Sequence, residues 1–221
     1  MNVRIILASI FSLTALSITA SASAASIHSI LPYYLQDSKG LSLSIKKVKT
    51  GVSNIKLKFR EGTVGDFKYS DYGLDVKNLD IYAKNFSYAK GKSGSGPRTK
   101  GLIEIRSLEI EEHAVEQFML SYFPKLRTLS MDFDGGYIIA RGKYGKTKFK
   151  AVFIIYNPYP GTTSSDICFK LKKISALNIR LPAWPVNAAI KKYNFFLSRA
   201  NTGLKFKFGE IILKGGKITI L

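Results

Sequence analysis

Cysteine is almost missing from this chain, which contains only Cys168 among its 221 residues. A single cysteine excludes a disulfide within the chain. With two histidines and no C-x-x-C or H-x-x-x-H pair, few ligands remain for zinc. A chain of this length buries a sizeable apolar core without such crosslinks. We therefore expect no metal and no cofactor.

Acidic residues are also scarce. The chain has 15 aspartates and glutamates against 34 lysines and arginines, which gives a formal charge of +19. So large an excess raises the local concentration of anionic partners but does not determine the fold. Three classes of partner suit it: nucleic acid, anionic lipid and the acidic polymers of a cell envelope. No recognised DNA-binding or RNA-binding motif accompanies the charge.

Recognisable catalytic motifs are missing as well. Gly91-Lys92-Ser93 ends like a phosphate-binding loop, but Phe86 stands where that motif needs its first glycine. Neither Ser93 nor Ser95 lies in a complete G-x-S-x-G pattern. An envelope hydrolase would need a cleft in which carboxylates with raised pKa values meet His113. We therefore expect a protein that is not an enzyme.

The one long apolar run lies at the start of the chain. Residues 5–18 follow Arg4 and precede a stretch of small residues with an A-x-A site that ends at Ala24. This order is typical of a secretory signal peptide, and the run is shorter than the roughly 20 residues of a membrane span. We predict a cleavable signal peptide at residues 1–24 and a single periplasmic or secreted domain at residues 25–221. Because export separates the protein from nucleic acid, we expect no nucleic-acid partner.

Most of the remaining sequence alternates apolar residues with lysine or small polar residues. Examples of this pattern lie at residues 41–45, 55–59, 149–153, 169–171 and 204–208. Alternation of this kind predicts antiparallel strands with one apolar face and one wet face. Lysines take wet positions in several of them: Lys46, Lys56, Lys58, Lys148, Lys150, Lys170, Lys205 and Lys207. The glycine-rich segment 90–100 and the segment 156–166 are expected to be loops.

Two stretches follow the helical period instead. The first begins at Glu112 and ends before Pro124, and the second begins at Pro185 and continues to Arg199. Their apolar faces consist of Val115, Phe118, Met119 and Tyr122 in the first, and of Val186, Ile190, Tyr193, Phe196 and Leu197 in the second. The sequence thus predicts an α+β fold, in which a strongly curved, mainly antiparallel sheet packs on two amphipathic helices.

A Gly-Gly pair follows each predicted helix between two alternating runs. Gly135-Gly136 and Gly215-Gly216 supply the positive φ angles that tight hairpin turns require. Residues 131–140 and 211–220 are similar at a constant offset. Either an imperfect duplication of a helix-hairpin unit or two ordinary hairpins account for this similarity.

From Leu43 onward, the order of these features resembles the LmeA-like phospholipid-binding family of secreted or periplasmic bacterial proteins. The resemblance rests on residues 44–57, 75–81, the helix at 112–122, the Gly135-Gly136 hairpin, residues 177–182 and the hairpin at 211–220. It implies binding of phospholipid in the envelope and brings no catalytic motif. The high lysine content and the basic segment 90–100 depart from the family's pattern.

The leading hypothesis is therefore non-catalytic binding of anionic phospholipid in the bacterial cell envelope or at a membrane surface. In this hypothesis the two helix faces contact acyl chains, and Lys191 and Lys192 contact the headgroup. The alternative is a cationic interaction protein that binds an acidic envelope polymer or a protein partner. In that case the helix faces belong to the core only.

Overall fold

The computed structural model describes residues 32, 35–50, 52–65, 67, 71–89, 98–156, 168–177, 179–184, 187 and 205–221. The predicted signal peptide at residues 1–24 lies outside these residues. So do most of the two predicted loops and nearly all of the second predicted helix. The segment expected to be a loop up to Lys100 is shorter than predicted, because strand β5 already begins at Arg98.

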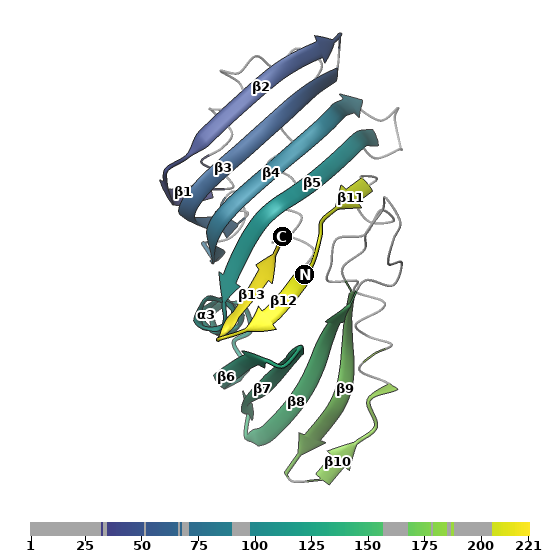
Figure 1. Cartoon of the computed structure of the whole chain (residues 1–221). Coiled ribbons are helices and arrows are strands. Elements are labelled where there is room, and N and C mark those ends of the chain that lie inside the picture. The colour runs from purple at the N-terminus through teal and green to yellow at the C-terminus, as the bar shows by residue number, and fades with distance from the viewer. Residues whose placement is uncertain are drawn as a thin grey trace.

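The described strands form two sheets, and Figure 1 shows the larger sheet above the smaller one. The larger sheet has the strand order β1-β3-β4-β5-β13-β12, with β2 beside β3 and β11 beside β5. Its strands are β1 (Leu35–Lys39), β2 (Ser42–Lys49), β3 (Val52–Gly65), β4 (Gly73–Ala89), β5 (Arg98–Glu111), β11 (Lys205–Lys207), β12 (Ile211–Lys214) and β13 (Lys217–Ile220). All of these pairings are antiparallel except that of β11 with β5.

The smaller sheet is an antiparallel meander of five strands in the order β10-β9-β8-β7-β6. Its strands are β6 (Leu126–Asp134), β7 (Tyr137–Tyr144), β8 (Thr147–Tyr156), β9 (Cys168–Ala176) and β10 (Ile179–Leu181). Strand β6 contacts β12 and β13 of the larger sheet. Strand β10 forms the opposite edge, far from β1 to β5 (Figure 1).

The predicted α+β fold class is wrong. Among the described residues, strands make up 74% and helix 10%, and these residues form two sheets and one short helix rather than one sheet packed on two helices. The sequence pattern underestimated the strands because their alternation is interrupted: β3, β4 and β5 have 14, 17 and 14 residues. A search for period two divides each of them into shorter runs.

In each of these strands the buried positions shift by one residue, from Phe59 to Gly62 in β3 and from Ile105 to Leu108 in β5. In β4 the buried side chains are Val76 and then Leu79, since Asn78 between them adopts a left-handed φ of 50°. The pairing of β4 with β5 shifts at the same point. An extra residue of this kind moves the alternation by one position and bends the strand. The three long strands curve toward the smaller sheet as a result (Figure 1).

Helix α3 (Glu112–Tyr122) lies where the two sheets meet and contacts β4, β5 and β6. Its predicted bounds are confirmed, with Glu112 in the first turn and the chain leaving the helix at Phe123. Phe118 of this helix, Phe133 of β6 and Ile218 of β13 belong to a single apolar cluster. The core is therefore shared by both sheets rather than divided between them.

Both predicted Gly-Gly hairpins are confirmed. Gly135 and Gly136 join β6 to β7, Gly215 and Gly216 join β12 to β13, and all four have positive φ. Strand β13 then pairs with β5, while β6 belongs to the other sheet. The second helix of the proposed duplication lies outside the described residues, so the duplication stays a prediction.

Candidate functional site

The predicted lipid-contacting face of the first helix lies in the core. Phe118 is 6% exposed, and Val115 and Met119 are partly buried against the same apolar cluster. Tyr122 ends helix α3, but its side chain is outside the described part of the structure. In this position the face stabilises the junction of the two sheets.

The other predicted contact residues lie outside the described residues. They are Val186, Ile190, Tyr193, Phe196 and Leu197, together with the predicted headgroup residues Lys191 and Lys192. The structure therefore does not place the two predicted helix faces relative to each other, and the roles assigned to these residues stay predictions.

One face of the five-stranded sheet is apolar along its whole width. Cross-strand partners share a face, and one row of partners runs Met131, Ala140, Ala151, Ile174 and Leu181 across all five strands. A second row contains Phe133, Ile138, Phe153 and Leu171. Burial decreases along the first row, from a buried Ala151 to Leu181, which is 41% exposed.

The opposite face carries a cluster of cations on β7 to β10, and Asp132 and Asp134 of β6 lie on the same face at its inner margin. Arg141 lies directly across from Lys150, and Lys143 lies directly across from Lys148. All four side chains are exposed. Like charges directly opposite each other destabilise a sheet, so the fold keeps two such pairs at a cost. An anion bound between them would offset the repulsion.

Further cations extend this surface across the sheet. Arg180 continues the row of Arg141 and Lys150 through Ser175, and Lys173 and Lys170 lie opposite Val152 and Ile154. We call this surface the basic face; its cations are Arg141, Lys143, Lys148, Lys150, Lys170, Lys173 and Arg180. Every described ion pair lies on the larger sheet or on α3, so these cations have no carboxylate partner among the described residues.

The outer margin of the sheet exposes large apolar side chains. Leu177 and Ile179 are each 66% exposed, Leu181 41% and Trp184 72%. We call these four residues the apolar edge. Ile179 and Leu181 pair with Ala176 and Ile174 of β9, so they extend the apolar face to the end of the sheet. Apolar groups exposed together in this way are a feature of binding surfaces.

The chain after β10 is tied to this margin by Asn187. Its amide oxygen accepts a hydrogen bond from the Leu171 N–H at 2.8 Å, and its amide nitrogen donates one to the Leu171 carbonyl at 2.9 Å. The Asn187 N–H also donates to the Ala183 carbonyl at 2.9 Å, across a single turn that includes Trp184. These bonds complete the edge of β9 beyond β10 and hold Trp184 beside it.

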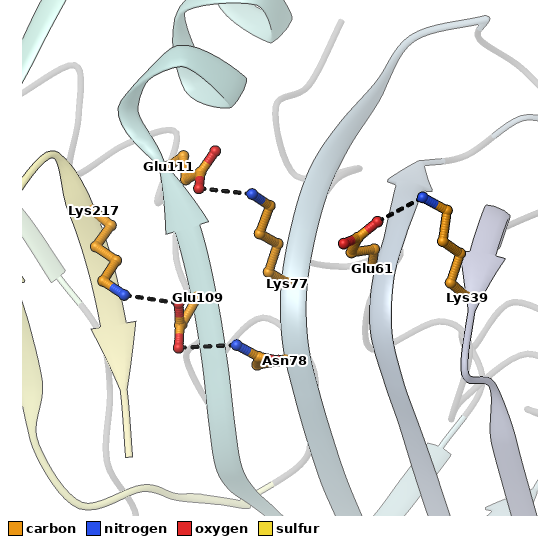
Figure 2. Close-up of polar contacts among 7 residues, drawn as sticks. All are labelled: Lys39, Glu61, Lys77, Asn78, Glu109, Glu111 and Lys217. Carbon is orange, nitrogen blue, oxygen red and sulfur yellow. Dashed lines mark hydrogen bonds and ion pairs between the residues drawn. The ribbon is translucent and has the colours of Figure 1, made fainter.

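The wet face of the larger sheet differs because its charges alternate in sign (Figure 2). Lys39 contacts Glu61 at 2.9 Å, and Lys77 of the next strand contacts Glu111 at 2.7 Å. Glu109 accepts from Lys217 and from Asn78, each at 3.0 Å. These contacts link β1 to β3, β4 to β5 and β5 to β13, and they support the register of each pair.

The pKa values in this network follow from its contacts. The hydrogen bond and charge of Lys39 lower the pKa of Glu61, and the hydrogen bond from Lys217, followed by that from Asn78, lowers the pKa of Glu109. Glu111 raises the pKa of Lys77. A general acid needs a raised carboxyl pKa, so Glu61 and Glu109 are unsuited to that role.

The remaining sequence candidates for chemistry are solvated or structural. The His113 side chain is 75% exposed, and its Nδ1 lies 3.8 Å from Glu116. Asp132 and Asp134 share the wet face of β6, as their spacing predicts. Within the described ranges, no group of three histidine, cysteine, aspartate or glutamate residues is placed to hold a metal ion.

Sequence reasoning did not find the paired cations or the apolar edge. Gly145 and Lys146 form a two-residue turn between β7 and β8, with a positive φ at Gly145. A two-residue turn fixes the register of the two strands, and this register places Arg141 opposite Lys150. The turn was therefore the sequence signal from which the paired cations could have been predicted. Strand β10 has only three residues, which gives too little alternation to be recognised.

Comparisons with protein-family models, with curated proteins and with solved structures found no match to this chain. Among the residues that the structure describes, no helix has the length and apolar character needed to cross a bilayer.

Proposed function

We propose that this protein binds anionic phospholipid in the cell envelope without catalysis, and that the five-stranded sheet carries the binding surface. The observation behind this proposal is the combination of unpaired, directly opposed cations with exposed apolar side chains on one sheet. A phospholipid surface offers both a phosphate and hydrocarbon, whereas an acidic polysaccharide offers charge alone. The signal-peptide pattern and the resemblance to the LmeA-like family point to the same class of ligand.

The basic face would interact with phosphate by charge rather than by a preformed pocket. Each lysine or arginine near an anionic membrane surface contributes about 1 kcal/mol of attraction. Arg141 and Lys150 are already forced together by the strand register, so a bridging phosphate would also relieve their repulsion. Removing both charges should therefore weaken binding by tenfold or more.

The test is co-sedimentation of the purified protein with vesicles of phosphatidylglycerol or of phosphatidylcholine at moderate salt. The double variant Arg141→Gln, Lys150→Gln is compared with Lys46→Gln, Lys47→Gln. The latter removes the same charge from exposed positions of β2 in the larger sheet. We expect selective binding to phosphatidylglycerol and a loss of about tenfold in the first variant only. Equal losses in both variants, or no vesicle binding by the unmodified protein, would contradict the proposal.

A further inference from the structure

We infer that the apolar edge, formed by Leu177, Ile179, Leu181 and Trp184, inserts into the anionic membrane, so that the five-stranded sheet meets the bilayer edge-on. This inference rests on the proposed function, because it specifies how the same sheet engages its lipid. It assigns the contact with hydrocarbon to described residues outside the two predicted helix faces.

The position of the edge favours this mode of contact. Strand β10 forms the margin of the smaller sheet opposite β6, and β6 is the strand that adjoins the rest of the molecule (Figure 1). The four apolar side chains follow one another in sequence along this margin, and all of them except Leu181 are more than half exposed. A membrane can therefore reach them without any change in the two sheets.

The chemistry of the edge changes from one face of the sheet to the other. Ile179 and Leu181 lie on the apolar face, whereas Arg180 between them pairs with Ser175 on the basic face. Lys172 and Lys173 on the neighbouring strand are exposed. Edge-on insertion would place the apolar side chains among acyl chains while the long cationic side chains extend to the phosphates. Tryptophan is itself favoured at the level of the headgroups.

Charge complementarity selects a membrane over a second copy of this chain. Pairing two β10 edges would bring Arg180, Lys172 and Lys173 of both copies together without acidic partners, and like charges across strands oppose such pairing. With three residues, β10 also offers few backbone groups for a strand from another chain. An anionic bilayer instead satisfies the cations and the apolar groups together.

Trp184 provides a built-in probe because it is the only tryptophan in the chain. Its emission is recorded while phosphatidylglycerol vesicles are added, with acrylamide as the aqueous quencher and brominated acyl chains as the membrane quencher. We expect a blue shift, protection from acrylamide and quenching by the brominated lipid. Vesicle binding with Trp184 still fully accessible to acrylamide would overturn the insertion while leaving the proposed function in place.

Variants of the edge give a second readout. Ile179→Ser with Leu181→Ser should lower vesicle affinity by about tenfold or more. The matched control is Leu41→Ser with Val48→Ser, which changes exposed apolar residues near strand β2 and should have little effect. Unchanged affinity in the edge variant, or a dimer of the free protein that this variant dissociates, would contradict the inference. If the unmodified protein binds no vesicles, the proposed function fails, and the inference fails with it.

Discussion

The carboxylate of Glu116 on helix α3 accepts a hydrogen bond from the backbone N–H of Met131 on strand β6. One helical turn earlier, Glu112 accepts from the N–H of Phe133 at 3.2 Å. The two N–H groups are two residues apart and point away from the partner strand β7, at the edge of the sheet. Two glutamate side chains of the helix thus accept hydrogen bonds from the edge of β6, where free N–H groups could otherwise pair with another strand.

Replacing Glu116 tests this role. Glu116→Ala leaves a partly buried N–H without an acceptor and should reduce the free energy of unfolding by about 2 kcal/mol. Glu116→Gln keeps a side-chain oxygen at the same position and should lose about half as much. Urea denaturation of both variants measures the difference. Equal losses would show that the charge of Glu116, rather than its hydrogen-bond acceptor, stabilises the junction.

A glycine on β7 sets the distance between two strands. A Cβ added at Gly142 would overlap the carbonyl oxygen of Thr128 and lie 3.1 Å from the Phe149 ring. Gly142→Ala should therefore cost about 3 kcal/mol, because backbone atoms must move. Gly135→Ala is the control: its φ of 57° penalises alanine by about 1 kcal/mol, but no atom lies in the way. Thermal unfolding ranks the two variants, and the opposite order would contradict this packing.

The pH dependence of stability should reflect Glu109. Lys217 and then Asn78 lower its folded-state pKa below the ordinary value of 4.5. A lowered carboxyl pKa stabilises the folded state above pH 4.5, and that contribution is lost as the pH falls through the folded pKa. Glu109→Gln should therefore be less stable by at most about 1 kcal/mol at pH 7. The difference should shrink progressively below pH 4.5.

Urea titrations at constant ionic strength from pH 7 to pH 3 follow this difference. Glu210→Gln serves as the control, since Glu210 is exposed and forms no ion pair within the described part of the chain. Its stability should match that of the unmodified protein throughout. A difference between Glu109→Gln and the unmodified protein that persists at pH 3 would rule out the ion pair as its source.

Local structure was readable from the sequence wherever one short pattern determined it. The spacing of Val115, Phe118 and Met119 located α3, and each Gly-Gly pair located a hairpin because positive φ is required there. The beta-rich character was also predicted correctly. In these cases the residues that form the sequence pattern are the same residues that form the helix face or the turn.

The rest depended on pairings between distant segments. The bulge at Asn78 interrupts the alternating pattern, so the full length of β4 could not be recognised from the sequence. No local pattern indicates that β13 pairs with β5 while β6 belongs to a second sheet. For the same reason the sequence predicted an α+β fold with one sheet packed on two helices, whereas the described residues form two sheets that meet at a single helix. The opposed cations became visible only once the register of β7 and β8 was known.

The central claim is that the five-stranded sheet binds anionic phospholipid through charge and apolar contact together. The most direct test compares binding to phosphatidylglycerol vesicles with binding to an immobilised acidic polysaccharide as salt is raised to 1 M. At 1 M salt the Debye length is about 3 Å, so adhesion that depends only on exposed charges disappears. We predict that polysaccharide binding is lost while part of the vesicle binding persists. Parallel loss of both, or tighter binding to the polysaccharide, would contradict the account.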